Sequence, residues 1–155
     1  MNILTAAVVL VGVFLLLYIA GWFIYNRFIV DKPDIFEDME GSDFEKYCAD
    51  LLIAMGYEEV ELTPASHDFG VDIFADKDGI SYAFQCKCYA DPVGIKAIQE
   101  VYAGKDYYGC MVGVVITNQE FTKSAKEFAD RLNVLLWDGE KVSDMISAYM
   151  LYDGK

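Results

Sequence analysis

The chain has 155 residues, enough for one domain, and its formal net charge is −13, from 12 Lys and Arg against 25 Asp and Glu. This balance argues against a broad basic face, because surfaces that bind nucleic acid normally gather Lys and Arg. Between Gln85 and Arg131, however, the two signs of charge are about balanced. The four cysteines form no Cys-x-x-Cys pair, so we interpret them as reduced core residues rather than zinc ligands.

The first segment, from Ile3 to about Tyr25, is almost wholly apolar. About twenty such residues span the hydrocarbon core of a bilayer. We therefore predict a transmembrane anchor over residues 1–30. Arg27 and Lys32 follow it, which favours a single-pass protein of the cell membrane whose C-terminal part is cytoplasmic. The alternative is a buried core helix, which a domain of this size could scarcely surround.

Residues 31–41 form an acidic stretch punctuated by Pro33 and Gly41, which predicts a short tether to a domain over residues 42–155. Ser42 with Glu45 three residues later is typical of a capping box. The apolar residues that follow recur at helical spacing until Gly56, so a helix is expected there.

Two apolar runs, 68–75 and 80–89, flank a turn over residues 76–79. This pattern predicts an antiparallel hairpin, because Gly79 can adopt the positive φ that closes such a turn. A strand over about residues 59–63 precedes the hairpin.

Three polar side chains interrupt the apolar hairpin. Asp72 lies in the first run, and Gln85 and Lys87 lie near the end of the second at a spacing of two, which places both on one face of a strand. Burying a carboxylate, an amide and an ammonium together is costly for structure alone. The group therefore indicates a metal-assisted hydrolytic site, with a structural Asp72–Lys87 ion pair as the alternative.

The remaining elements follow in order. Residues 95–108 are expected to form a second helix, and the β-branched run over 110–117 a strand buried on both faces. Thr122 can cap a third helix that ends at Leu132, and a strand over 134–137 and a helix over 141–152 complete the chain. The order α-β-β-β-α-β-α-β-α predicts a mixed sheet with helices on both faces.

Asp72 followed across a hairpin by Gln85-Cys86-Lys87 resembles the PD-(D/E)xK nuclease superfamily, in the Gln-x-Lys form typical of Mrr-like, type IV restriction endonuclease domains. The resemblance covers roughly Phe44 to Trp137. It implies a restriction-endonuclease-like α/β fold, in which a mixed β-sheet is flanked by helices, preceded here by the transmembrane helix.

The resemblance also implies roles for the site residues. Asp72 and Gln85 would offer oxygen ligands to Mg²⁺ or Mn²⁺, and Lys87 would orient or polarise the attacking water. Glu45 would complete the metal shell, although a plain helix-capping role is an equal alternative. Gln in place of the usual Glu removes one negative charge and predicts a weaker or single metal site.

Three further residues are candidate nucleic-acid contacts: Gln99 and Lys105 on the second helix, and His67 beside the site. A solvated helix face and an exposed loop are the alternative interpretations. The expected partners are DNA, the membrane and a second copy of the chain.

Two functions are consistent with this pattern. The first is a membrane-anchored, Mg²⁺-dependent DNA endonuclease that restricts foreign or modified DNA. The second is a membrane-anchored nucleic-acid-binding or sensing module that keeps the nuclease fold with little or no catalysis, as the acidic charge and the Gln substitution suggest.

Overall fold

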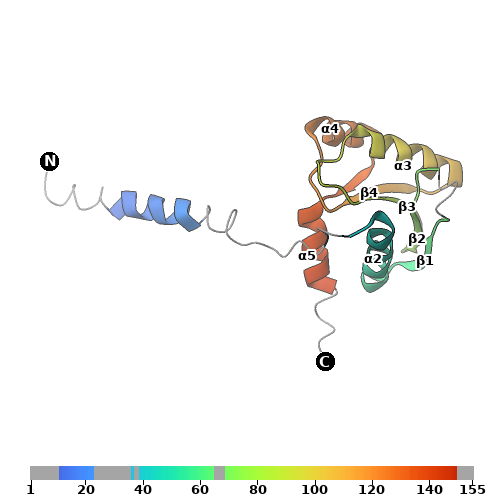
Figure 1. Cartoon of the computed structure of the whole chain (residues 1–155), viewed down its shortest axis with the longest axis horizontal. Coiled ribbons are helices and arrows are strands. Elements are labelled where there is room, and N and C mark those ends of the chain that lie inside the picture. The colour runs from blue at the N-terminus through green and yellow to red at the C-terminus, as the bar shows by residue number, and fades with distance from the viewer. Residues whose placement is uncertain (1–10, 23–35, 37–38, 65–68, 150–155) are drawn as a thin grey trace, which may run out of the picture. The chain divides into compact units, whose positions relative to one another are not determined.

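The computed structural model describes residues 11–22, 36, 39–64 and 69–149. The chain divides into two compact units, Met1–Ile35 and Phe36–Lys155. The second unit holds, in order, α2 (Gly41–Ala54), β1 (Glu58–Leu62), β2 (Ile73–Lys77), β3 (Ile80–Lys87), α3 (Ile95–Tyr108), β4 (Val112–Thr117), α4 (Lys123–Leu132), β5 (Leu135–Trp137) and α5 (Gly139–Tyr149) (Figure 1).

The predicted transmembrane anchor is wrong for the part of the chain that the structure describes, where no helix is both long and apolar enough to cross a membrane. Residues 11–22 are helical. The predicted localisation as a single-pass membrane protein depended on this anchor and is corrected with it. Residues 1–10 and 23–30 lie outside the described residues.

The sheet has five strands in the order β1-β2-β3-β4-β5. β1, β2 and β3 are antiparallel neighbours, whereas β3, β4 and β5 run parallel. The crossovers from β3 to β4 and from β4 to β5 contain α3 and α4, as parallel neighbours require. The predicted mixed α/β sheet and the predicted order of elements are therefore confirmed.

Helices cover both faces of this sheet, and each face has its own apolar core (Figure 1). On one side, Phe84 and Ile116 pack against α2 and α5. On the other, Val115 packs against α3 and α4. Phe36, which falls within the predicted tether, is buried in the first core and meets Phe44 edge-on at 5.2 Å between ring centroids.

The hairpin of β2 and β3 is tighter than the sequence pattern predicted. Lys77 pairs with Ile80, so the loop contains only Asp78 and Gly79. Both residues have positive φ, 54° and 77°, as the two central residues of a type I′ turn require. The register of the site-bearing strands therefore depends on a two-residue turn.

Two expected helix caps had different outcomes. The side chain of Thr122 accepts a hydrogen bond from the Ala125 N–H at 3.2 Å, which confirms the cap of α4. The Ser42–Glu45 capping box is wrong, because α2 begins at Gly41 with Glu40 at the N-cap and without a side-chain cap hydrogen bond. The earlier start places Ser42 inside the first turn, where it cannot act as the cap.

Candidate active site

Asp72 lies immediately before β2, where its backbone is hydrogen-bonded on both sides. Its N–H donates to the Phe84 carbonyl of β3 at 2.7 Å, and its carbonyl accepts from the Thr63 N–H at 2.9 Å. The Thr63 hydroxyl also donates to the Val71 carbonyl at 2.7 Å. The main chain that carries the carboxylate is thus an extension of the sheet.

The Asp72 side chain is 6% exposed and is bonded to β3. Its Oδ2 accepts a hydrogen bond from the Cys86 N–H at 2.6 Å and another from the Gln85 amide nitrogen. Within the described residues, the Gln85 Oε1 is buried and has no hydrogen-bond partner. Since buried polar atoms are nearly always paired, this oxygen is available to a ligand.

Lys87 ends β3 on the same face as Gln85, and its ammonium contacts α3. Its Nζ lies 3.3 Å from Oε2 of Glu100, with side-chain exposures of 20% and 31%. Burial lowers the pKa of Lys87, but the charges of Glu100, Tyr89 and Asp72 outweigh this effect and raise that pKa above its usual value. Lys87 is therefore a cation at neutral pH.

Glycines bring α3 into close contact with the segment that leads to Asp72. Gly70 has φ +82°, and a Cβ there would lie 2.6 Å from the Glu100 carbonyl oxygen. A Cβ on Gly104 would lie 2.5 Å from the Phe69 carbonyl oxygen. This backbone-to-backbone contact requires glycine at both positions.

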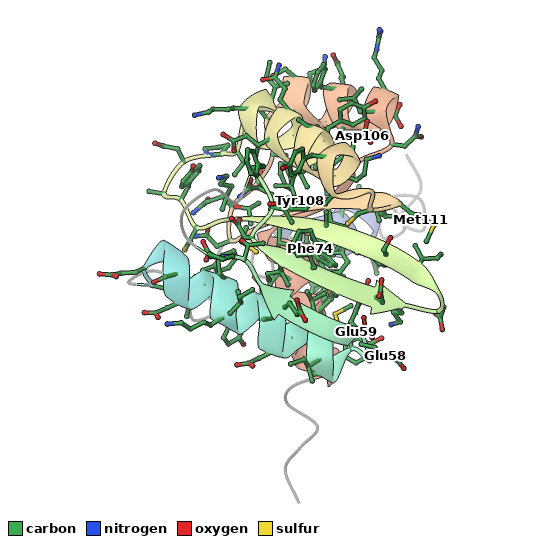
Figure 2. All side chains as sticks on the ribbon, turned by 90° about the vertical axis from the view of Figure 1, so that its right-hand side faces the viewer. Glu58, Glu59, Phe74, Asp106, Tyr108 and Met111 are labelled. Atoms are coloured by element: carbon green, nitrogen blue, oxygen red, sulfur yellow. The ribbon has the colours of Figure 1, made fainter. Side chains whose placement is uncertain are left out.

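Aromatic side chains fix the other end of α3. Figure 2 shows Tyr108 of α3 beside Phe74 of β2, and their ring centroids are 4.7 Å apart. Phe69 lies 4.7 Å from Tyr107, again between centroids. The helix that carries Glu100 is therefore held against β2 and the preceding loop at two places.

Cys86 points to the opposite face of β3, as its spacing from Gln85 predicted. A hydrogen bond with Cys48 and burial raise the pKa of the Cys86 thiol well above its usual value, and the charges of Cys48, Asp72 and Glu45 add to the effect. The half-buried Glu45 of α2 thus lies within electrostatic reach of β3, on the side of the sheet away from α3.

The family model described as a restriction endonuclease, Mrr_cat, matches residues 36–146. The chain belongs to the Mrr_cat restriction endonuclease family. A comparison with curated proteins gave no match.

Three solved structures resemble this Mrr_cat chain. The protein of unknown function AF1548 is 22% identical with a TM-score of 0.58, over 67% of this chain and 64% of its own. The DNA modification-dependent restriction endonuclease AspBHI is 17% identical with a TM-score of 0.54, over 68% and 30%. MspJI restriction endonuclease, in complex with a 27-mer oligonucleotide, is 21% identical with a TM-score of 0.60, over 79% and 31%. At these identities the likeness shows the fold alone, and the chain spans less than two thirds of each of these proteins.

The residues of the candidate site fit a hard divalent cation. Mg²⁺ prefers oxygen ligands and commonly takes one or two protein carboxylates while keeping several waters. The Asp72 carboxylate and the unpartnered Gln85 oxygen are such ligands, and they belong to side chains in direct contact. Among the described residues, no three His, Cys, Asp or Glu side chains gather at one point.

Two of the three candidate nucleic-acid contacts lie on α3. Gln99 is exposed on α3. Lys105 is 17% exposed, pairs with Asp106 at 2.8 Å and lies over the Tyr102 ring. It belongs to the half of α3 that follows Glu100. His67 lies outside the described residues.

Sequence analysis missed Glu100, which contacts Lys87. The available signal was Lys96 four residues before it, which forms an i,i+4 ion pair with Glu100 at 3.6 Å. Such pairs usually indicate a solvated helix face, so the signal gave no reason to place Glu100 beside β3.

Proposed function

We propose that this chain is a DNA endonuclease that hydrolyses phosphodiester bonds with Mg²⁺ or Mn²⁺. The observation that carries the proposal is the contact of Asp72 with Gln85, whose buried oxygen has no partner among the described residues, next to the cationic Lys87 on the same strand. Membership of a restriction endonuclease family supports the reaction class. The oligonucleotide bound by MspJI and the DNA-modification dependence of AspBHI support DNA, and modified DNA in particular, as the substrate.

Phosphodiester hydrolysis requires compensation of the charge that develops on the phosphate and an oriented water. Asp72 and Gln85 would hold the cation, and a half-turn of the Gln85 carboxamide exchanges its nitrogen and oxygen so that the oxygen faces Asp72. When bound, the cation supplies charge compensation and acidifies a water. Lys87 binds a phosphate oxygen or the attacking water through its ammonium, which Glu100 and Asp72 keep charged.

Glu45 remains a proposed third ligand. Its charge reaches Cys86, but it approaches from the α2 side, whereas Gln85 and Lys87 face α3. A weaker site with one cation is consistent with one carboxylate and one carboxamide in direct contact. The second copy of the chain expected from sequence also stays a prediction.

Plasmid cleavage by the full chain tests the proposal. Supercoiled plasmid with Mg²⁺ or Mn²⁺ should be nicked or linearised, and a chelator should stop the reaction. Asp72→Asn and Lys87→Ala should each abolish cleavage. Glu127→Gln is a matched control, because it removes an exposed carboxylate of α4 that pairs only with the exposed Lys123 at 3.8 Å among the contacts described.

Calorimetry distinguishes the alternative. No heat on titration with Mg²⁺, together with no cleavage of methylated or unmethylated plasmid, would favour a nucleic-acid-binding or sensing module, whereas Mg²⁺ binding that Asp72→Asn removes would count against it. Cleavage that survives in both Asp72→Asn and Lys87→Ala would contradict the assignment of the site itself.

A further inference from the structure

One carboxylate on α3 contacts two lysines of different environment. Glu100 Oε2 lies 3.3 Å from Nζ of Lys87, which is 20% exposed, and Oε1 lies 3.6 Å from Nζ of Lys96, which is 88% exposed. The two ion pairs share Glu100, so together they connect the solvent-exposed Lys96 with Lys87 on the strand that carries the site. The two oxygens of Glu100 are thus divided between a solvent lysine and the site lysine.

We propose that Glu100 is a positioning residue that fixes the ammonium of Lys87 for phosphodiester hydrolysis. The proposal deepens the endonuclease function above and rests on it. Lys87 has a long flexible stem with three rotatable donors. A partner anchored on a second element restricts that ammonium to one side of β3, the side that carries Gln85.

The backbone of Glu100 is fixed in relation to Asp72 as well. Gly70, two residues before Asp72, leaves no room for a Cβ against the Glu100 carbonyl. The backbone of Glu100 therefore contacts the loop that carries Asp72, the proposed cation ligand, while the side chain of Glu100 contacts Lys87. Supporting residues of this kind, locked by packing, set the geometry of the groups that do the chemistry.

Stability alone does not explain this carboxylate. Ion pairs near the surface contribute little to folding. An anion close to the site also repels the DNA phosphate backbone and so weakens substrate binding. Glu100 is therefore unfavourable for DNA binding. Its contact with Lys87 indicates that it orients the Lys87 ammonium instead.

Steady-state cleavage of plasmid by the full chain separates positioning from binding. Glu100→Ala should lower kcat by roughly 10- to 100-fold, as loss of a supporting partner does, while KM stays constant or falls because an anion is removed. Glu100→Gln keeps an acceptor for Lys87 and should retain more activity than Glu100→Ala. Glu127→Gln, the exposed carboxylate of α4, should behave like the wild type.

A double-mutant cycle tests whether Glu100 acts through Lys87. Because Lys87→Ala should leave no cleavage to compare, the cycle uses Lys87→Arg, which keeps a cation: if Glu100 acts through Lys87, Lys87→Arg combined with Glu100→Ala should be no slower than Lys87→Arg alone. Additive losses, a rise in KM with kcat unchanged, or a Glu100→Ala chain as active as the wild type would each overturn the proposal.

An NMR measurement that does not depend on catalysis distinguishes the positioning proposal from the proposed endonuclease function. The side-chain ammonium resonance of Lys87, assigned by its disappearance in Lys87→Arg, should be resolved in the wild type and shift or broaden in Glu100→Gln but not in Glu127→Gln. If the wild type does not cut plasmid, the proposed endonuclease function fails, and the positioning proposal fails as a catalytic role even where this resonance responds. An unchanged resonance in Glu100→Gln overturns the positioning role whatever the activity.

Discussion

The amide nitrogen of Gln85 donates to the carboxylate of Asp72, while the amide oxygen of the same group is buried and finds no hydrogen-bond partner in the described part of the chain. A neutral amide satisfies the buried carboxylate without introducing a second charge. A glutamate at this position would place two like charges in contact, and each would disfavour ionisation of the other. The carboxamide therefore stabilises the folded site before any cation binds.

Gln85→Glu should lower the free energy of unfolding in the absence of metal and increase the rise in Tm that Mg²⁺ causes. The new carboxylate faces Asp72 and loses the amide donor, so we expect a loss of about 1–3 kcal/mol in the free energy of unfolding. Because a cation that binds only the folded state stabilises it, Mg²⁺ should raise Tm more in this variant than in the wild type. Thermal unfolding across a Mg²⁺ titration measures both effects. Gln99→Glu adds the same charge on the exposed face of α3 and serves as the control; equal behaviour of the two variants would contradict the prediction.

Gly70→Ala should destabilise the fold more than Gly79→Ala. Both glycines have positive φ, +82° and +77°, so both substitutions carry the left-handed strain of about 1–2 kcal/mol. At Gly79 nothing lies within 4 Å of the new Cβ, whereas at Gly70 the Glu100 carbonyl oxygen lies at 2.6 Å. The difference between the two free energies of unfolding in urea isolates the cost of separating α3 from the Asp72 loop. Equal losses would show that the close contact is not maintained.

Asn118→Ala should weaken the end of the sheet next to the site. The Asn118 side chain accepts from the Tyr89 N–H and donates to the Tyr89 carbonyl, both at 2.9 Å, so it fixes the chain where it leaves β3. Loss of two such bonds should cost about 1–2 kcal/mol in urea unfolding, and cleavage should slow because Lys87 lies two residues before Tyr89. Asn118→Asp keeps the acceptor and should fall between the wild type and Asn118→Ala. A larger loss in the Asp variant than in the Ala variant would run against this account.

Stability should fall at alkaline pH as Tyr57 ionises in the unfolded chain. Burial, followed by the charge of Tyr82, raises the pKa of Tyr57 from 10.0 to about 12. Because the folded pKa lies above the unfolded one, the contribution of Tyr57 is complete below pH 10.0 and is lost as the pH rises to about 12. Tyr57→Phe should show a shallower decline in unfolding free energy over this range, with tyrosinate absorbance reporting the ionisation. An identical decline in both proteins would assign it to other groups.

The grouping of Asp72, Gln85 and Lys87 follows from local rules. A turn with Gly79 sets the hairpin, and the period of two along β3 separates Gln85 and Lys87 from Cys86. These relations depend on residues close in sequence. The order of the elements and the proximity of Asp72 and Gln85 could therefore be predicted.

Glu100 could not be found in this way, because its contact with Lys87 depends on how α3 packs on β3. Sequence analysis chose Gln99 and Lys105 on the same helix. Gln99 immediately precedes Glu100, and each residue of an α-helix turns the side chain by about 100° around the axis. The predicted anchor rested on a different argument: an apolar run reports composition, whereas crossing a bilayer requires a helix that is both long and apolar enough, and no such helix is found among the described residues.

The two-residue turn at Asp78 and Gly79 restricts how this protein can change during evolution. Most surface loops tolerate insertions, but a slip of one residue between β2 and β3 would turn Gln85 toward α2 and present Cys86 to Asp72. The length of this loop therefore determines which side chains of β3 face Asp72, although the loop closes the opposite end of the hairpin. We expect natural variation here to preserve loop length even where the sequences of homologous hairpins diverge.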